Sequence, residues 1–566
     1  MAPARDVRRR AIAWLALGAI ARGAPADPPA PWEPEAPSAT DRRVPPPQVF
    51  RESAAGRVSV APFARVTQVN VNPQGLNIVG DAANEPSLAV DPNNRNRIAA
   101  GWRQFDSVTS SFRQAGVAWS RDGGESWNPL PPLDAGVFRS DPVLESDANG
   151  VFYYNSLLGG EFSTWIYRSL NGGRTWGAPT FAFGGDKQWM AIDKTDSPSR
   201  GRIYQAWNIA GNNHFPATFN RSPDAGQTWT QPTTIPARPI FGTLTVGRGG
   251  EVFILGAATS GSTELVVVRA LNAGHPTDPP VFLPAVTVPL GGAPLRGIQV
   301  NPGGLAGQLI IDQDRSTGPF AGRLYALGAV DPPGADPADV HLCRSDDNGA
   351  TWSPFLRVND DTIGAYQWFA TMSVAPDGRV DVAWNDTRNG AEPRFSEIFY
   401  AFSLDGGASF SPAFRLTLPY DSLIGWPQQN KIGDYWDMDS DIEGADLIVA
   451  ATWNGEQDVY HIRITPPICA DSGRDCNANS VNDECEIQVG LAFDANQNAI
   501  PDECETPSCL ADTDRSGTVD FDDITRILEA WASSGAAGRI GDASADGRVD
   551  LTDVTVVLQR WLQTCP

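Results

Sequence analysis

Oxygen-bearing side chains recur at a fixed spacing in two segments near the C-terminus. In the first segment, positions 1, 3, 5, 9 and 12 are occupied by Asp or Ser, and the second segment repeats this order 30 residues later. A glycine stands at position 6, and a backbone carbonyl is expected to serve at position 7. This spacing is typical of a loop that wraps a calcium ion, because alternate residues point at one centre. The predicted ligands are Asp512, Asp514, Ser516, Thr518, Asp520, Asp523, Asp542, Ser544, Asp546, Arg548, Asp550 and Asp553.

Two further segments carry a related pattern, Asp-x-Asn-x-Asn-x-aliphatic-x-Asp-Glu-Cys, at residues 475–485 and 494–504. Their odd positions again bear side-chain oxygens, which predicts additional calcium loops. A polar spacer held by disulfides is the alternative, because six of the seven cysteines lie between residues 469 and 565. Their connectivity is left open. The predicted ligands are Asp475, Asn477, Asn479, Asp483, Asp494, Asn496, Asn498 and Asp502.

A third group of polar and charged side chains lies beside short apolar runs in the long central part of the chain: some precede a run, Asp386 and Arg388 follow the strand at 382–384, and Asp434 and Tyr435 lie within the segment IGDYWDM. These residues could form a ring of carboxylates, with Arg and Tyr, that binds a sugar or a cation. They could equally be caps and ion pairs that fasten neighbouring structural units to one another. The candidates are Glu85, Asp141, Asp186, Asp386, Arg388, Asp434 and Tyr435.

The elements that position these candidates are predicted from an eight-residue repeat. It reads SRDGGESW at residues 120–127, SLNGGRTW at 169–176, SPDAGQTW at 222–229, SDDNGATW at 345–352 and SLDGGASF at 403–410, with a degenerate copy at 270–277. Alternating apolar runs precede several copies, so each copy predicts a tight turn between two strands. Its Asp or Asn accepts backbone N–H bonds, and its Gly supplies a positive φ.

Between these copies lies a second repeated piece, a strand that follows an acidic or glycine-rich turn. Seven such units begin near residues 97, 150, 201, 250, 322, 378 and 445. Radial repetition of four-stranded units predicts an all-β propeller of seven blades, with six blades as the alternative. The last unit lacks an outer strand, which residues 57–70 could supply by closing the ring.

The repeated box resembles the Asp box of sialidases and their relatives, and phrases such as NEPSLAVDP, DKQWMAID and VAWNDTR resemble secreted bacterial sialidase-like proteins. The resemblance covers roughly residues 80–465 and implies that the boxes are structural turns away from any active site. An active sialidase would need three convergent arginines, a tyrosine nucleophile and a carboxylic acid. Arg388 and Tyr435 are the candidates for two of these roles, but the first blade has no Phe/Tyr-Arg-Ile-Pro motif.

The C-terminal segments carry two further resemblances. The asparagine-rich loops resemble thrombospondin type 3 repeats. Residues 510–563, in which each calcium loop leads into an apolar helical stripe, closely resemble a dockerin and imply attachment to a cohesin-like or cell-surface protein. Acidic turns between two ordinary helices are the alternative. Residues 469–566 hold 19 acidic residues and six arginines, which disfavours nucleic acid and anionic membranes as partners.

The N-terminus predicts export. Arg8, Arg9 and Arg10 precede an apolar stretch at residues 11–21 and a small-residue cleavage site at 24–26. The expected domains are a signal peptide (1–26), a proline-rich linker (27–55), a propeller (56–466), a cysteine-containing calcium-repeat linker (467–508) and a small α-helical dockerin-like domain (509–566). Three functions stay open for a secreted or cell-surface propeller: glycan binding, glycoside hydrolysis of the exo-sialidase type, and a protein-interaction scaffold.

Overall fold

A computed structural model describes residues 43–258, 264–362 and 364–467, and, towards the C-terminus, residues 476, 483, 487, 492, 501, 504, 511–514, 516–532, 541–544 and 548–562. The expected signal peptide and the first part of the expected linker lie outside the described residues. Within them, no helix is both long enough and apolar enough to cross a membrane.

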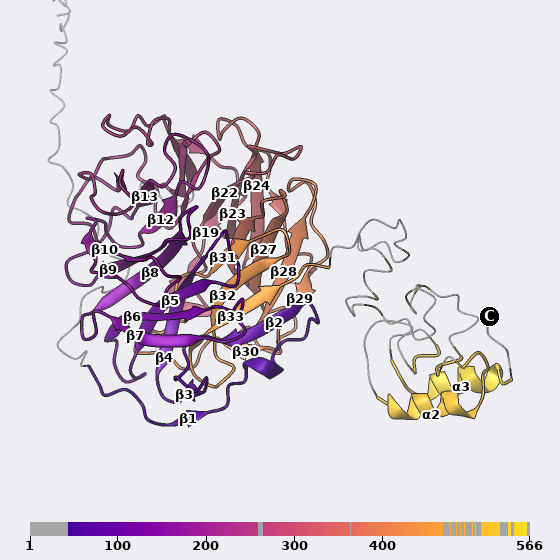
Figure 1. Cartoon of the computed structure of the whole chain (residues 1–566). Coiled ribbons are helices and arrows are strands. Elements are labelled where there is room, and N and C mark those ends of the chain that lie inside the picture. The colour runs from indigo at the N-terminus through magenta and orange to yellow at the C-terminus, as the bar shows by residue number, and fades with distance from the viewer. Residues whose placement is uncertain are drawn as a thin grey trace, which may run out of the picture.

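The central part of the chain is a β-propeller of seven blades, which confirms the prediction of seven over six (Figure 1). Each blade is an antiparallel sheet whose first strand lies innermost. Blade 1 comprises β4 (Ala82–Val90), β5 (Ile98–Phe105), β6 (Arg113–Ser120) and β7 (Asn128–Leu133). Blade 2 comprises β8 (Arg139–Ser146), β9 (Phe152–Leu158), β10 (Ser163–Ser169) and β11 (Thr180–Phe181). Blade 3 comprises β12 (Trp189–Ile192), β13 (Ile203–Ala206) and β14 (Phe219–Ser222).

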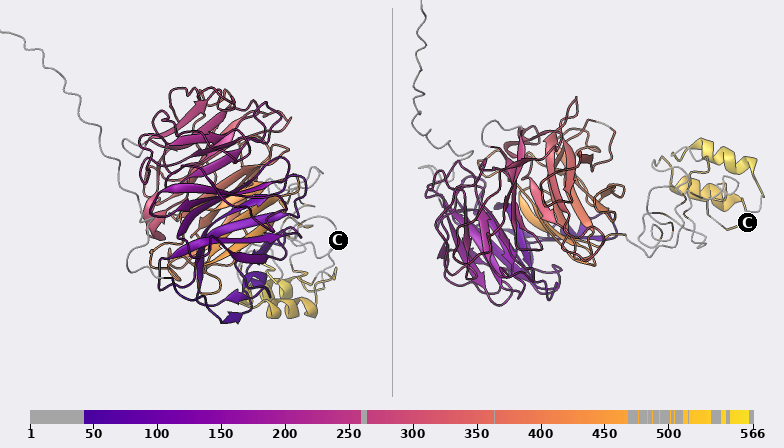
Figure 2. Two further views of the ribbon diagram at one scale, coloured as in Figure 1. Left: turned by 60° about the vertical axis from the view of Figure 1, so that its left-hand side comes forward. Right: turned by 90° about the horizontal axis from the view of Figure 1, so that it is seen from above.

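Blades 4 to 7 follow the same order (Figure 2). Blade 4 comprises β15 (Leu244–Val246), β16 (Val252–Ala257), β17 (Leu265–Ala270) and β18 (Val286–Thr287), and blade 5 comprises β22 (Ile310–Gln313), β23 (Leu324–Asp331), β24 (Asp339–Ser345) and β25 (Leu356–Arg357). Blade 6 comprises β26 (Gln367–Val374), β27 (Val380–Asp386), β28 (Phe395–Ser403) and β29 (Phe414–Arg415), and blade 7 comprises β31 (Asp437–Ser440), β32 (Ala445–Ala451) and β33 (Asp458–Ile464). The apolar core fills the space between neighbouring blades, where Trp368, Trp384 and Trp436 are completely covered.

The ring is closed by the N-terminal part of the chain. Strand β2 (Ala64–Gln68) pairs antiparallel with β33 and becomes the outer strand of blade 7. This outcome matches the closure expected for residues 57–70. Because β2 and β33 are almost 400 residues apart in sequence, the first and last blades cannot separate without breaking this ladder.

Each intact Asp box forms the turn after the third strand of its blade. The copy in blade 5 is representative: the Asp347 carboxylate accepts bonds from the backbone N–H of Thr351 (2.8 Å) and from its hydroxyl (2.6 Å). The hydroxyl of Ser345 accepts the N–H of Gly349, whose φ is +79°. In blade 3 only an isolated bridge between Phe219 and Thr233 takes the place of a fourth strand. The boxes are therefore structural turns at the same end of the propeller as the turns that follow the inner strands.

At the opposite end, a residue with positive φ lies near the start of every inner strand, either among its first four residues or up to four residues before it. The seven residues belong to seven different blades, and register shifts mark bulges in β4, β8 and β26. Five of them are not glycine, so each costs of the order of 1–3 kcal/mol in backbone strain. The bulges turn side chains toward the propeller axis. They are Glu85 (+48°), Asp141 (+45°), Lys187 (+53°), Phe241 (+58°), Gly307 (+118°), Phe369 (+54°) and Gly433 (+112°).

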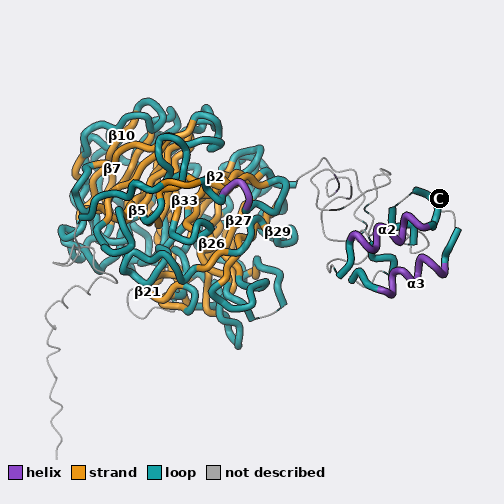
Figure 3. Tube along the Cα trace, turned by 90° about the horizontal axis from the view of Figure 1, so that it is seen from below, coloured by secondary structure: helices purple, strands orange, loops and turns teal. Residues whose placement is uncertain are grey.

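Short elements outside the blades cover this end and the rim. The hairpin of β20 (Arg296–Ile298) and β21 (Asn301–Leu305) precedes blade 5 and lies near the axis. Figure 3 shows β21 among the loops of the propeller. The others are β1 (Phe50–Arg51), β3 (Asn77–Ile78), β19 (Ala293–Pro294), β30 (Tyr420–Asp421) and the 3-10 turn η1 (Ala55–Arg57).

The C-terminal segment contains the two predicted helices, α2 (Phe521–Glu529) and α3 (Leu551–Gln559), which lie side by side (Figures 1 and 3). Each begins at an aspartate whose side chain accepts a backbone N–H, Asp520 for α2 and Asp550 for α3. The third helical residue, Asp523 or Asp553, bonds back to the backbone of that cap, so both helices start with the same capping box. The repeated loop–helix pattern in the sequence thus gives two equivalent helix starts.

Candidate functional site

Four of the predicted carboxylates meet at the end of the axis where the inner strands begin. Lys187 of blade 3 lies 2.8 Å from Asp434 of blade 7 and 3.3 Å from Asp141 of blade 2. Blades 3 and 7 are not neighbours, so this contact crosses the axis. Lys431 bridges Glu85 (3.2 Å) and Asp434 (2.8 Å). We call the following set the axial ion network: Glu85, Arg103, Arg113, Asp141, Asp186, Lys187, Lys431 and Asp434.

The axial ion network contains four carboxylates and four cations, all at most 2% exposed. The β20–β21 hairpin covers it: the N–H of Leu305 donates to the Asp434 carboxylate (2.8 Å), and the Asn301 amide donates to the carbonyl of Gly433 (2.8 Å). Burial raises the pKa of Glu85, and the neighbouring Arg103 and Lys431 limit that rise. The network is thus balanced in charge and closed to solvent, which fits a fastener between blades.

Tyr435, the candidate nucleophile, lies beside this network. Its hydroxyl donates to the carbonyl of Pro142 (2.8 Å), and its ring packs edge to face against Trp189. Burial, with the charges of Glu85 and Asp141 nearby, raises the pKa of Tyr435 well above its usual value. In this arrangement Tyr435 is a neutral hydrogen-bond donor.

The structure places Arg388 and Asp386 elsewhere, in a cluster at blade 6. Arg388 lies 2.8 Å from Asp386 and also pairs with Asp360, and its guanidinium covers the ring of Phe399 at 4.5 Å. Asp386 accepts a further bond from the indole N–H of Trp384 (2.9 Å). The seven predicted propeller residues therefore divide into five at the axis and two in blade 6.

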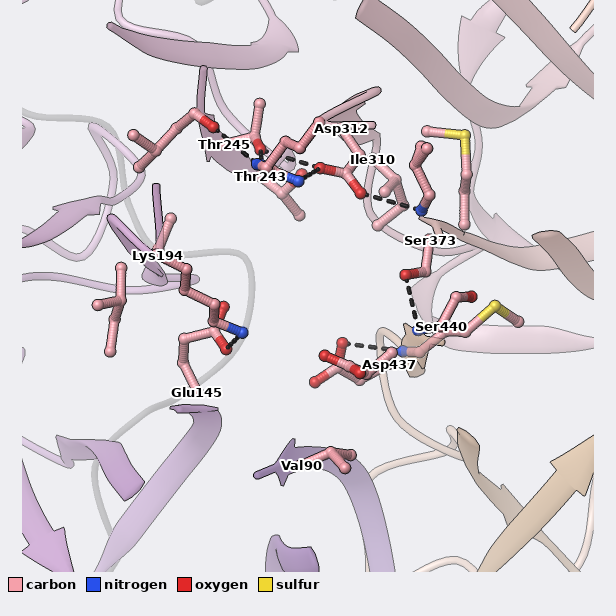
Figure 4. Close-up of a pocket in the computed structure, with 18 of the residues that line it drawn as sticks. Val90, Glu145, Lys194, Thr243, Thr245, Ile310, Asp312, Ser373, Asp437 and Ser440 are labelled. Carbon is pink, nitrogen blue, oxygen red and sulfur yellow. Dashed lines mark hydrogen bonds and ion pairs between the residues drawn. The ribbon is translucent and has the colours of Figure 1, made fainter. Parts of the chain in front are cut away.

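A cavity of about 360 Å³ runs along the inner strands to the turns that follow them, at the other end of the axis. Residues from all seven blades line it, including Val90, Lys194, Thr245, Asp312 and Ser373. We call it the axial cavity (Figure 4). Its wall combines carboxylates and hydroxyls with apolar side chains such as methionines and a tryptophan. A volume of this size is typical of small-ligand sites.

Most charges of the axial cavity are paired with one another. Lys194 lies 2.6 Å from Glu145, and Arg315 lies 2.8 Å from Asp312. Arg95 pairs with Asp439 and Asp441. These ion pairs lie along the wall of the cavity and leave its centre open.

Asp437 differs from the other carboxylates of the axial cavity. It accepts bonds from the Ser87 hydroxyl (2.6 Å) and from the backbone N–H groups of Leu88 (3.2 Å) and Met438 (2.9 Å). Among the described residues it forms no ion pair. Burial, together with the charge of Glu145, raises the pKa of Asp437 to about 7. Figure 4 shows its carboxyl group on the side of the cavity opposite Glu145 and Lys194.

The sequence analysis did not identify the axial cavity. Each blade contributes only one short stretch to it, and these stretches are separated by tens of residues. The available signal was weak: polar residues within an inner strand and next to it, as in the WDMDSD segment at residues 436–441.

The first predicted calcium loop brings its carboxylates together. Oxygens of Asp512, Asp514 and Asp523 lie within 4.8 Å of one another. Burial and the charges of the other two carboxylates raise the pKa of Asp512 to about 6. No cationic side chain compensates them within the described part of the loop. A hard cation with oxygen ligands fits such a donor set.

The second loop repeats the geometry of the first. Asp523 accepts the N–H groups of Asp514 (2.9 Å) and Asp520 (2.7 Å), and Asp553 accepts those of Ser544 (2.9 Å) and Asp550 (2.7 Å). Asp483 is described in the asparagine-rich segment, where it accepts the N–H of Cys476. The predicted ligands that lie outside the described residues are Asp475, Asn477, Asn479, Asp494, Asn496, Asn498, Asp502 and Asp546.

The two C-terminal helices expose equivalent apolar residues. Phe521, Leu528 and Trp531 of the first loop–helix unit are 66%, 58% and 46% exposed. In the second unit the equivalent residues, Leu551, Leu558 and Trp561, are also exposed. The small core between the helices is formed instead by residues such as Val519, Ile527, Val549 and Val557.

Two of the cysteines form a disulfide, Cys476–Cys504. It joins the two asparagine-rich loops, a pairing that the sequence left open. Cys343 is buried in blade 5, and burial raises its pKa to about 12. Cys469, Cys485, Cys509 and Cys565 lie outside the described residues.

Comparison with known proteins places the chain by fold alone. No family model matches it, and no curated protein matches it. Similar solved structures include a PL25 ulvan lyase (TM-score 0.42, 11% identity, 68% of this chain and 94% of that chain). They also include a Hadza microbial sialidase (0.36, 11%, 76% and 98%) and an α-L-arabinanase of Penicillium chrysogenum (0.38, 13%, 72% and 98%). This chain is a seven-bladed β-propeller, and likenesses at these scores carry no inference about its chemistry.

Proposed function

We propose that the protein is an extracellular glycan-binding β-propeller without sialidase activity, attached to a protein partner through its calcium-loaded C-terminal segment. One observation carries the proposal: five of the seven predicted catalytic residues are sealed in or beside the axial ion network and the other two pair in blade 6, whereas the open polar cavity extends to the other end of the axis.

The geometry argues against hydrolysis at the predicted residues. A tyrosine nucleophile must reach the substrate, yet Tyr435 is 2% exposed and donates its proton to a backbone carbonyl. The carboxylates beside it are engaged with Lys187 and Lys431. Arg388, the candidate carboxylate clamp, pairs with aspartates in blade 6. Three arginines free to bind a sialic acid carboxylate are not found among the described residues of this network.

The axial cavity has the size and chemistry for one sugar residue. Its hydroxyls and carboxylates can exchange hydrogen bonds with sugar hydroxyls, and Trp189, Met372 and Met438 offer apolar surface to the C–H groups of a ring. The hydroxyl of Ser440 has no hydrogen-bond partner, although the residue is only 8% exposed. A buried hydroxyl without a partner is costly, and a bound polar ligand would satisfy it.

The C-terminal segment supports calcium-dependent attachment. Asp512, Asp514, Ser516, Asp520 and Asp523, with the carbonyl of Thr518, would hold one ion, and the equivalent residues of the second loop would hold another. A bound cation would neutralise the carboxylate repulsion and hold the two helices in place. The exposed Phe521, Leu528 and Trp531, with their equivalents on α3, then form a surface suited to a cohesin-like partner.

Export is consistent with the predicted signal peptide and with the Cys476–Cys504 disulfide, since disulfides persist in oxidising compartments. A glycan array with the full chain in calcium, beside a fluorogenic sialoside assay on wild type and Tyr435→Phe, tests the proposed function. We expect glycan binding and no sialoside hydrolysis by either protein. Hydrolysis that is lost in Tyr435→Phe would overturn the proposal, and so would an array without any bound glycan.

A further inference from the structure

We infer that the axial cavity selects a sugar residue that carries a free primary amine, with the Asp437 carboxylate as the counter-ion of the ligand's ammonium group. This inference rests on the proposed glycan-binding function. It adds the class of ligand and the residue that recognises it.

The charge of the cavity wall favours a cationic group in the ligand. Five carboxyl groups and three basic groups line the axial cavity, so its formal charge is negative when all are ionised. Carboxylated sugars would meet this field unfavourably, whereas an ammonium group would be attracted. The groups are Arg95, Glu145, Lys194, Asp312, Arg315, Asp437, Asp439 and Asp441.

The basic groups of the wall are all paired with carboxylates, which leaves one carboxyl group without a cation. Every basic group is already held by a carboxylate of the same wall: Lys194 by Glu145, Arg315 by Asp312, and Arg95 by Asp439 and its neighbours. Asp437 is the one lining carboxyl with no cationic partner in the described chain. It is held in place by Ser87 and two backbone N–H groups, so its position does not depend on a ligand.

The ligand must supply a hydrogen-bond donor to Asp437. A carboxylate that accepts bonds from three protein donors and still faces an open cavity can take one more donor, and an ammonium group is the strongest donor available. The unpartnered Ser440 hydroxyl lies in the same strand, three residues away, and can bond a sugar hydroxyl. The cavity, at about 360 Å³, accommodates one amino sugar residue.

Proton exchange gives the site a signature. Because burial raises the pKa of Asp437 to about 7, the carboxyl group holds a proton in slightly acidic solution. Binding of an ammonium group ionises it and releases that proton to solvent. We therefore expect affinity for an amine-bearing sugar to rise between about pH 5.5 and about pH 7, and to fall again where the ligand's amine loses its own charge.

The test is calorimetric titration of the full chain with glucosamine, glucose and N-acetylglucosamine. We expect glucosamine to bind at least about tenfold more tightly than the other two, and Asp437→Asn to remove that preference. Ser440→Ala, which removes a hydroxyl without a partner, should keep the stability of the fold and weaken all sugars that bind. Asp331→Asn, an exposed carboxylate at the end of β23 that does not line this wall, is the charge-matched control and should change nothing.

The outcomes separate this inference from the proposed function. Equal binding of glucose and glucosamine, or a glucosamine preference that survives in a folded Asp437→Asn variant, would overturn the inference while glycan binding stands. Loss of glucosamine preference in Asp437→Asn, with Ser440→Ala folded and weakened, supports it. No binding of any of the three sugars, together with an empty glycan array, would remove both proposals.

Discussion

The carboxylates at the two ends of the propeller axis are compensated in different ways. At one end, the charged positive-φ residues Glu85, Asp141 and Lys187 contribute to the axial ion network, in which four carboxylates accompany four buried cations. Towards the other end, the inner strands and the turns after them line an open cavity, in which Asp437 has hydrogen bonds but no ion pair among the described residues. The ion pairs of the axial ion network join different blades, whereas we propose that Asp437 in the axial cavity binds a ligand.

The C-terminal loops are a third arrangement of carboxylates. Asp512, Asp514 and Asp523 converge without a cationic side chain among the described residues of the loop, and we propose that a bound cation compensates them. The three clusters differ in what compensates their carboxylates. Lys and Arg match those of the axial ion network, whereas we propose that an ammonium group and a cation from outside the chain match Asp437 and the C-terminal loop.

The largest expected effect separates the two ends through their lysines. Lys187→Met removes the cation between Asp141, Asp186 and Asp434, and should cost about 3–5 kcal/mol of unfolding free energy, because buried carboxylates lose their partner. Lys194→Met at the cavity mouth removes a pair whose side chains are 29% and 25% exposed, and should cost less than about 1 kcal/mol. Equilibrium denaturation of both variants measures this, and equal losses would contradict the comparison.

Calcium removal should have the next largest effect, confined to the C-terminal segment. Calcium at about 100 times its dissociation constant should stabilise that segment by about 2.7 kcal/mol, because the ion binds only the folded loops. Asp512→Ala and Asp542→Ala should each weaken one site, whereas Glu529→Ala on the exposed face of α2 should weaken neither. Calcium titration and limited proteolysis of the full chain report both. Unchanged proteolysis in a chelator would show that these carboxylates are not a cation site.

An Asp-box substitution should have a smaller effect and should leave ligand binding intact. Asp347→Ala removes the acceptor of two bonds from Thr351, as in the loss of a helix cap, and should cost about 1 kcal/mol. Thermal unfolding measures the cost. A change in sugar affinity in the same variant would mean that the boxes act at the axial cavity as well as in the turns.

The smallest expected effect is the pH dependence contributed by Asp437 without a ligand. Its folded-state pKa, about 7, lies above its ordinary value, so its contribution to stability is complete in acid and is lost as the pH rises through 7. Asp437→Asn should remove this slope. Thermal unfolding of wild type and variant between about pH 5.5 and about pH 8 measures the difference, and parallel curves would show that Asp437 does not titrate there.

Much of the fold could be predicted from local sequence, because its signals are local. Each Asp box is complete within eight residues, as the bonds between Asp347 and Thr351 illustrate, so five good copies located the outer turns. The closing strand could be anticipated because the last unit lacked a partner. The seven positive-φ positions could not be predicted. Phe241 and Phe369 adopt positive φ against their own preference, and their N–H groups bond to Asn208 and to the Ala306 carbonyl, which belong to other parts of the ring.

Only part of the candidate site, the carboxylates at the axis, could be predicted from the sequence. Glu85, Asp141, Asp186 and Asp434 could be chosen because each stands beside an apolar strand, and both alternatives, ligand ring or blade fastener, could be stated. Which alternative the structure favours depends on Lys431, which reaches Glu85 across 346 residues of chain. The axial cavity depends in the same way on one residue or short stretch from each blade, and no local motif marks it.

The account's central claim is that the open end of the axis binds the ligand and the sealed end does not. A crystal structure of the full chain soaked with glucosamine tests this most directly. We predict a sugar in the axial cavity, with its amine within hydrogen-bond distance of Asp437 and one of its hydroxyls bonded to the Ser440 side chain. The axial ion network should be unchanged. A sugar bound over Glu85 and Lys187 at the other end, with the β20–β21 hairpin displaced, would contradict it.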